Sequence, residues 1–330
     1  MRLPQICLYV ALIGAGLTLA ACSKAPGSRR AFSPAPQVRT SNIALAATGV
    51  AGQAASANGG KIHLFTPPPE SAIPDDAFGA MVREGELIFT HTRQYAGAYV
   101  GNGLTCEDCH LDAGRQPGSA PLWAAYVRYP RYRSKNDMVN SYADRLRGCF
   151  RFSMNGTPPP PDGTVIKALT AYSYWLATGA PTGVNLPGAG YADPGKPAQE
   201  PSYDRGQVVF NSDCALCHGG NGQGQKALGQ YVFPPLWGPD SFNWGAGMAE
   251  VNNAAAFIKA NMPFSLGGSL TSQQAWDVAL FMDSHERPQD PRFTSSVATT
   301  RKKYHNTRWS MYGETINGRL LGSAPLVRRR

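Results

Sequence analysis

The feature that most limits how this chain of 330 residues can fold is a short pattern that occurs twice, at 106–110 and at 214–218. In each copy, two cysteines with two residues between them are followed directly by a histidine. Two thiols one helical turn apart can add across the vinyl groups of a porphyrin, and the histidine then ligates its iron. Because a redox dithiol does not use the histidine and a structural zinc site needs four ligands at matched spacing, the pattern predicts two covalently bound haem c groups. The predicted attachment residues are Cys106, Cys109, His110, Cys214, Cys217 and His218.

The segments around the two motifs also repeat. Each motif follows a Gly-x-x-x-Phe segment and precedes a Pro-Leu-Trp segment, and each unit closes with apolar residues three and four positions apart. That period predicts an amphipathic helix, and Thr271 is expected to be the N-cap of the second one. No strand-like alternation competes with the helical pattern. The apolar positions of the two closing helices are Val165, Leu169, Tyr172 and Leu176 in the first unit and Ala275, Val278 and Met282 in the second.

We therefore expect an all-α fold made of two small domains in tandem, at 73–190 and 196–291. The order of Gly-x-x-x-Phe, haem motif, Met-Pro and final helix in the second unit resembles class I cytochrome c. That resemblance implies one covalent haem c in each domain. It also implies that Met262, which stands in the Met-Pro pair, is the sixth ligand opposite His218, with Met248 as the alternative.

One cysteine near the first motif has no evident partner. Cys149 is left over once the motif cysteines and the two near the N-terminus are set aside. A thiolate donates strongly to ferric iron and is a nucleophile for sulfur chemistry, and a free thiol in an oxidising compartment needs a reason. The alternative follows from the repeat, because Met154 and Met262 each lie 44 residues after the histidine of their motif. Under that alternative Met154 ligates the first iron and Cys149 is a small buried side chain.

The stretch around Cys149 is distinctive over a longer range. Residues 144–156 have the sequence Asp-Arg-Leu-Arg-Gly-Cys-Phe-Arg-Phe-Ser-Met-Asn-Gly, and they resemble the distal loop of the dihaem thiosulfate dehydrogenases. Ordinary dihaem cytochromes lack such a cysteine loop. The resemblance covers residues 75–295. It also includes 101–105 and 111–114 around the first motif, and 235–238 and 284–288 in the second unit.

The resemblance implies two different ligand pairs. The active-site haem is expected to be held by His110 and Cys149, and the electron-exit haem by His218 and Met262. Some members of the family carry a lysine directly before the exit-haem methionine. In this chain that residue is Asn261, so an exchange between lysine and methionine ligands is not expected.

The resemblance also implies a substrate. The reaction is the oxidation of two thiosulfate ions to tetrathionate, with electrons passed to an external carrier such as a small cytochrome c. Arg145 and Ser153 match substrate-contacting positions, and cationic donors suit a small dianion. Lys135 is the expected upstream cation, with Arg133 as the second choice. Cys149 is expected to leave the iron and bond to one thiosulfate, and a second thiosulfate then attacks that adduct.

Two other functions stay open on the sequence. One is a dihaem electron-transfer cytochrome without a substrate of its own, in which Met154 ligates the first haem. The other is a subunit of a different sulfur-oxidation system, since the related sulfur-oxidation cytochromes also use a cysteine-ligated haem. The residues do not fix the direction of the reaction, so tetrathionate reduction is open as well.

The first residues have the features of a bacterial lipoprotein signal. Arg2 precedes an apolar run over 6–21 that is short for a membrane span, and the run ends in Leu-Ala-Ala followed by Cys22. We expect a signal peptide at 1–21, acylation of Cys22 and a flexible tether over 22–72 that is rich in Ala, Ser, Gly and Pro. Ordinary secretory cleavage is the alternative. The expected location is the periplasm, with a lipid anchor in the membrane.

The net charge of +9 is concentrated near the C-terminus. Residues 301–330 hold eight Lys or Arg and one Glu, and charge blocks of this kind are usually solvated. We therefore predict a basic, solvated tail over 292–330, with docking to an acidic redox partner or an anionic lipid surface as the alternative. Nucleic acid is not expected as a partner, because binding it requires basic charge on a folded face with interleaved aromatic residues.

Overall fold

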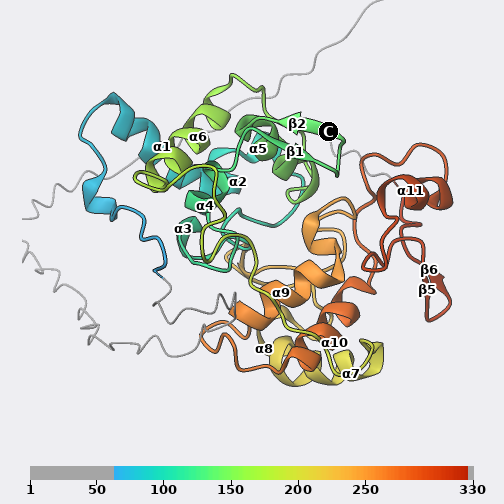
Figure 1. The fold of residues 1–330 in the computed structure, drawn as a ribbon. Coiled ribbons are helices and arrows are strands. Elements are labelled where there is room, and N and C mark those ends of the chain that lie inside the picture. The colour runs from blue at the N-terminus through green and yellow to red at the C-terminus, as the bar shows by residue number, and fades with distance from the viewer. Residues whose placement is uncertain (1–62, 326–330) are drawn as a thin grey trace, which may run out of the picture. The chain divides into compact units, whose positions relative to one another are not determined.

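A computed structural model describes residues 63–325, and Figure 1 shows their fold. The predicted signal peptide, Cys22 and most of the predicted tether lie outside the described residues. Helices dominate the described part of the chain, and its strands form three two-stranded antiparallel hairpins. None of the helices in this part is long and apolar enough to cross a bilayer.

Two helices of the first unit begin with side-chain N-caps. Asp76 is the N-cap of α1, and its side chain accepts a hydrogen bond of 2.8 Å from the Gly79 N–H. Ser141 and Asp144 form a reciprocal capping box at the start of α5. The elements are a 3-10 helix Glu70–Ala72, α1 Ala77–Thr90, α2 Thr92–Tyr95, a 3-10 helix Gly97–Tyr99, α3 Leu111–Gly114, α4 Leu122–Tyr126, β1 Arg131–Arg133, β2 Met138–Asn140, α5 Tyr142–Phe152 and α6 Thr164–Leu176.

The second unit repeats the same plan. Thr271 and Gln274 form a capping box at the start of α10, which confirms the predicted N-cap. The elements are α7 Tyr203–Val209, a π-helical turn Phe210–Cys214, α8 Ala215–His218, β3 Gln225–Ala227, β4 Gln230–Phe233, a 3-10 helix Gly247–Ala249, α9 Val251–Asn261 and α10 Ser272–Asp283.

In each unit the first long helix crosses the closing helix at a glycine. Helix α1 crosses α6 at Gly85, where a Cβ atom would lie 2.1 Å from the carbonyl oxygen of Ala168. Helix α7 crosses α10 at Gly206, where a Cβ atom would lie 2.1 Å from the carbonyl oxygen of Asp277. The repeated Gly-x-x-x-Phe segments therefore mark close backbone contact between the first and last helices of each unit.

The predicted apolar positions of the closing helices are buried, with one exception. Val165 is only partly buried, and the neighbouring Ile166, with 1% exposure, takes the inward position instead. The positions that are buried as predicted are Leu169, Tyr172, Leu176, Ala275, Val278 and Met282. The helical period of the sequence thus identifies the core-facing side of both helices.

The two units are joined by hydrogen bonds between buried polar groups. The side-chain amide of Asn102 donates to the carbonyl of Ser153 in its own unit at 2.7 Å and to that of Ser241 in the second unit at 3.2 Å. The Gly103 N–H donates to the carbonyl of Asp240 at 2.9 Å. Because unpaired polar groups are costly to bury, these bonds tie the two units together.

Residues 292–325 do not form the solvated tail that their charge predicted. They contain α11 Val297–Tyr304 and the hairpin β5 Thr315–Ile316 and β6 Arg319–Leu320, and they lie beside the second unit (Figure 1). Tyr312 and Leu321 have 0% and 1% exposure, and the Tyr312 hydroxyl donates to the Gln289 side chain at 2.9 Å. The prediction for these residues is wrong because it relied on net charge, while a few apolar anchors between the basic residues fix the segment.

Substitution of Gly206 by alanine tests the helix crossing. We expect the free energy of unfolding of the haem-loaded protein to fall by about 2 kcal/mol, because the added Cβ forces α7 and α10 apart. Gly148→Ala is the matched control, since a Cβ at that helical position has no neighbour within 4 Å. The control should be neutral or stabilising by up to about 1 kcal/mol. Equal stability of the two variants in denaturant titrations would contradict the close crossing.

Candidate functional site

A backbone carbonyl holds the histidine of the first motif. His110 Nδ1 lies 2.7 Å from the carbonyl oxygen of Ala120. Because a carbonyl oxygen can only accept a hydrogen bond, Nδ1 carries the proton and Nε2 keeps a free lone pair. Burial lowers the pKa of His110 to about 4, so the imidazole is neutral at neutral pH. The ring is therefore oriented and protonated as an iron ligand requires.

The second motif has the same arrangement. His218 Nδ1 lies 2.9 Å from the carbonyl oxygen of Pro234, and burial lowers the pKa of this histidine as well. The five cysteines in the described part of the chain are unpaired. The thiols of both motifs are thus available for thioether bonds, next to a histidine whose Nε2 can bind iron.

A mostly apolar cavity of about 340 Å³ adjoins the second motif. His218 and both motif cysteines line it, and so do Met262 and Met248. Its apolar walls include Phe257, Ile258, Val278 and Met282 from α9 and α10. Two thiols, a neutral imidazole, a thioether and apolar walls are the donors and surroundings of a c-type haem. The residues present fit that cofactor.

The first unit completes the wall of this cavity. Leu104, Cys109 and Leu111 line it together with the residues of the second motif. Cys109 belongs to the first motif, so the two attachment sites lie close together. A short separation favours direct passage of electrons from one site to the other.

A ligand cluster of the zinc type is not formed by the described residues. Within residues 63–325, no three His, Cys, Asp or Glu side chains come close enough together to hold a metal ion. A structural zinc site needs four such ligands. The arrangement instead has one histidine beside each cysteine pair, as in haem attachment.

Helix α5 presents three of the predicted site residues on one face. Arg145, Cys149 and Ser153 are each four positions apart, and the Ser153 backbone is still helical. Arg145 Nη1 donates to Cys149 Sγ at 2.7 Å. The Cys149 sulfur raises the pKa of the Arg145 guanidinium above its ordinary value. The helix therefore holds a cation directly against the leftover thiol.

This face of α5 is turned toward the first motif. Burial, with a contribution from the charge of Cys149, raises the pKa of Cys106 to about 12. Burial also raises the pKa of Cys109, again with a smaller contribution from Cys149. Met154, the alternative ligand, has 2% exposure and packs in the apolar core, whereas Cys149 is half-buried. The structure thus brings Cys149 near the first motif.

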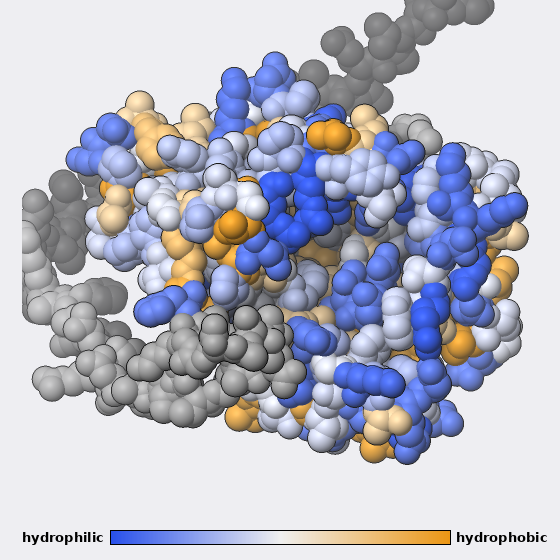
Figure 2. Space-filling model, in the orientation of Figure 1, coloured by the Kyte–Doolittle hydropathy of each residue, from blue (hydrophilic) through white to orange (hydrophobic). Residues whose placement is uncertain are grey.

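The β1–β2 hairpin brings two more cations to the same region. Burial lowers the pKa of Arg133, and the charge of Arg145 lowers it further. Lys135, in the turn of the hairpin, donates to the carbonyl of Gly245 and lies 4.6 Å above the ring of Phe152. Burial lowers the pKa of Lys135 to about 8. Figure 2 shows strongly hydrophilic side chains over α5, beside a hydrophobic patch on the hairpin, whose Met138 and Val139 are exposed.

Sequence reasoning missed one cation at this site. Arg292 lies 5.0 Å from the centre of the Phe152 ring, and its charge is the largest electrostatic contribution, after burial, to the lowered pKa of Lys135. It was placed in the predicted basic tail. No spacing or motif connects it to α5, because the two are far apart along the chain and meet only through the folded C-terminal segment.

Comparisons with known proteins agree with this site. Residues 92–182 match the family described as SoxA/TsdA, cytochrome c domain, and residues 201–282 match cytochrome C oxidase, cbb3-type, subunit III. A thiosulfate dehydrogenase of Thiomonas intermedia (strain K12) is 58% identical over 258 residues, which cover 78% of this chain and 82% of that protein. This chain belongs to the thiosulfate dehydrogenase family. A second member, from Stutzerimonas stutzeri (strain A1501), is 58% identical over 260 residues, which cover 78% of this chain and 85% of that protein.

A solved structure of the family has the same fold. It is the thiosulfate dehydrogenase TsdBA from Marichromatium purpuratum, with a TM-score of 0.77 and 47% identity. The match covers 79% of this chain and 58% of that longer chain. Together with the two cytochrome matches, it confirms the predicted fold class of two tandem cytochrome c domains and the prediction of two covalent haem c groups.

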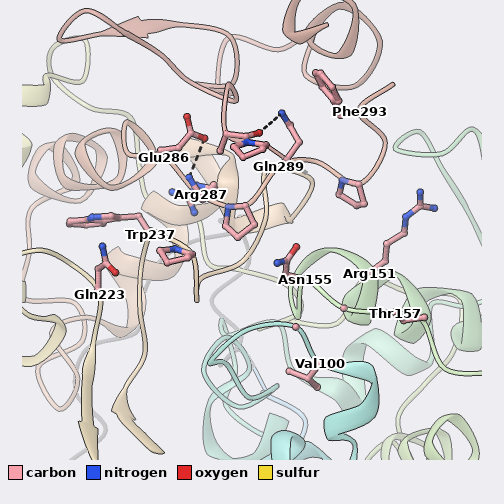
Figure 3. A pocket seen from close by; sticks show the side chains of 18 of the residues that line it. Val100, Arg151, Asn155, Thr157, Gln223, Trp237, Glu286, Arg287, Gln289 and Phe293 are labelled. Carbon is pink, nitrogen blue, oxygen red and sulfur yellow. Dashed lines mark hydrogen bonds between the residues drawn. The ribbon is translucent and has the colours of Figure 1, made fainter. Parts of the chain in front are cut away.

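A larger cavity of about 980 Å³ lies apart from the predicted site residues, none of which lines it. Arg151 and Asn155 from the first unit border it, across from Trp237 and Glu286 of the second unit (Figure 3). The Trp237 ring stacks on His285 with centroids 4.1 Å apart. The cavity therefore lies at the junction of the two units, and no residue of either haem motif lines it.

Substitution of Met262 by leucine tests the second ligand pair. We expect the near-infrared absorption of a methionine-ligated ferric haem to disappear, and the potential of the second haem to fall by on the order of 100 mV, because thioether ligation raises the potential. Met248→Leu is the matched control, since Met248 lines the same cavity. Retention of the band in Met262→Leu and its loss in Met248→Leu would reverse the assignment.

Proposed function

We propose that this chain oxidises two thiosulfate ions to tetrathionate at a site centred on Cys149. The observation that carries the proposal is the hydrogen bond of 2.7 Å from Arg145 to the Cys149 sulfur, beside the first motif and within a cluster of cations. A thiol in such surroundings suits the binding and sulfur chemistry of a small anion. The family membership of the chain supports the same substrate.

We assign His110 and Cys149 to the iron of the first haem, and His218 and Met262 to the iron of the second. When bound, the two haem groups supply one-electron acceptors for the two electrons that the reaction releases. The free Nε2 atoms of both histidines support these assignments. Met262 also lines the apolar cavity of about 340 Å³ beside the second motif, which supports its assignment to the second iron. The half-buried thiol near Cys106 and Cys109 supports Cys149 over the core residue Met154.

The cations bind the substrate. Arg145 offers a planar guanidinium, and Lys135 and Arg133 add positive charge from the hairpin, so a dianion meets several donors at once. Ser153, one helical turn beyond Cys149, can add a hydroxyl hydrogen bond to a sulfonate oxygen. Each of these groups favours the substrate in the orientation that points its outer sulfur at the thiol.

The chemistry takes place at two sulfur–sulfur bonds. The Cys149 thiolate and the outer sulfur of the first thiosulfate form one bond, with the loss of two electrons. The outer sulfur of a second thiosulfate then attacks the sulfur bound to Cys149, which releases tetrathionate and restores the thiolate. Arg145 stabilises the departing thiolate through its hydrogen bond. The same steps in reverse reduce tetrathionate.

The electrons leave toward a partner outside this chain. We infer a small cytochrome c or a similar carrier as the acceptor, with the second haem as the exit. We also infer export to the periplasm and a lipid anchor at Cys22, on the basis of the signal-like N-terminal sequence alone.

Substitution of Cys149 by alanine tests the catalytic role. We expect the rate of thiosulfate oxidation with an artificial electron acceptor to fall at least about 100-fold, because the sulfur that forms the covalent bond is absent. The ferric spectrum of the first haem should lose its thiolate signature. Met154→Leu is the control and should keep both. Normal activity in Cys149→Ala, with a spectral change in Met154→Leu, would favour a simple electron-transfer cytochrome instead.

The pH profile tests the role of Lys135. Its ammonium has a pKa of about 8, so it is charged below that pH and loses its charge as the pH rises through 8. We expect kcat/KM for thiosulfate to fall on that alkaline side. Lys135→Gln should raise KM roughly tenfold at pH 7 and abolish the alkaline fall. An unchanged profile in this variant would assign the upstream cation to Arg133.

A further inference from the structure

The Phe152 ring at the end of α5 is contacted by cations from two distant parts of the chain. Lys135 Nζ is 4.6 Å from the ring centre, and the guanidinium carbon of Arg292 is 5.0 Å from it. Arg151 contributes a third cation at 5.5 Å. Cations within about 6 Å of an aromatic face are attracted to it, so the ring joins Arg292 to the residue that we propose binds thiosulfate.

Arg292 is itself fixed in place by its neighbours. Its Nη2 lies 2.6 Å from Asp290 Oδ2 and its Nε 3.0 Å from Asp290 Oδ1, which makes a two-pronged ion pair. The guanidinium also lies 4.1 Å over the ring of Tyr304 in α11. The Arg292 side chain has 11% exposure and that of Asp290 has 0%, so the pair is shielded from water. A bidentate, stacked guanidinium is held in one orientation.

A histidine from the C-terminal segment also binds the Asp290 carboxylate. His305 Nε2 lies 2.9 Å from Asp290 Oδ2, and His305 Nδ1 lies 3.1 Å from Ser310 Oγ. Burial alone would raise the pKa of Asp290, but its bonds with His305 and Arg292 hold the pKa of this carboxyl below its ordinary value. The carboxylate therefore stays ionised at neutral pH and keeps Arg292 in position.

Gly245 connects this network directly to Lys135. The Lys135 ammonium donates to the carbonyl of Gly245. A Cβ on Gly245 would lie 2.5 Å from Phe152 Cδ1 and 3.2 Å from Asp290 Oδ2. No side chain fits between Phe152 and the Asp290 carboxylate, so the main chain that anchors Lys135 is packed against the group that anchors Arg292.

We propose that Arg292 is a positioning residue for Lys135, and that the C-terminal segment 292–325 is therefore part of the thiosulfate site. The inference rests on the proposed role of Lys135 in binding thiosulfate. Arg292 contacts the same Phe152 ring as Lys135 and adds positive charge near the ammonium. Substrate affinity at Lys135 thus depends on residues that begin after the second cytochrome domain has ended.

The charges around Lys135 determine how the loss of Arg292 is detected. Arg292, Arg145 and Arg133 repel the Lys135 ammonium, and Glu250 attracts it. Arg292 makes the largest of these four contributions. Without it the ammonium stays protonated to a higher pH, so the alkaline fall of kcat/KM moves upward. We call this fall the alkaline limb of the pH profile. Loss of a residue that only stabilises the fold would not change the pH at which the alkaline limb occurs.

The experiment compares Arg292→Gln with Arg292→Lys in the full-length, haem-loaded protein. We expect Arg292→Gln to raise KM for thiosulfate roughly threefold to tenfold at pH 7, to change kcat less than about twofold, and to move the alkaline limb upward by roughly half a pH unit. Arg292→Lys keeps the charge and should restore the wild-type limb. Arg308→Gln is the control from the same segment, because the Arg308 side chain is 63% exposed and its contacts, an ion pair with Glu200 and the ring of Trp309, do not involve Lys135 or Phe152, and it should change neither quantity.

Lys135→Gln, measured in parallel, separates the two proposals. If it abolishes the alkaline limb while Arg292→Gln keeps the wild-type limb and KM, Lys135 binds substrate and the inference about Arg292 is overturned. If Lys135→Gln keeps a wild-type KM and limb, the proposed role of Lys135 is wrong and the inference fails with it. Should Arg292→Gln not accumulate with both haems, Tyr304→Leu removes the ring under Arg292. An upward shift of the limb in that variant supports the inference, and an unchanged limb overturns it.

Discussion

Each cytochrome unit depends on one close helix crossing, where a glycine of the first helix meets a backbone carbonyl of the last. Gly85 and Gly206 make this contact in the two units, and at both positions even a methyl group would overlap the opposing main chain. The crossings fix the angle at which the closing helices meet the rest of their unit. In the second unit, His218 and Met262 line one cavity, and α10 adds Val278 and Met282 to its wall.

The two sites have different surroundings. The cavity beside the second motif is lined mostly by apolar side chains, which suits a group that only gains and loses electrons. The first site has a thiol hydrogen-bonded to Arg145, with Arg133 and Lys135 close by, which suits a small anion. Partial burial of positive charges costs free energy, and a bound anion would offset that cost. Desolvation also strengthens the attraction between the cations and an anion.

The sequence was most informative where the chemistry is local. Thioether attachment fixes the spacing of Cys214, Cys217 and His218, so the motif could be identified without any structure. Arg145 and Cys149 are four residues apart on one helix, and their contact follows from the helical period. The closing helices were predicted for the same reason, except that Ile166 rather than Val165 turned inward.

What the sequence could not give depends on contacts between distant segments. Arg292 is held beside Phe152 by Asp290 and by Tyr304 of α11, and the high net charge of the segment hid the anchors Tyr312 and Leu321. The hairpin that brings Lys135 inward is too short to show an alternating pattern.

Both units line the cavity beside the second motif, and this limits how such proteins can be divided or recombined. Leu104 and Leu111 belong to one half of the chain and line the cavity at the haem motif of the other. A half produced alone would leave that apolar wall open to water, so the two halves are a poor choice as interchangeable modules.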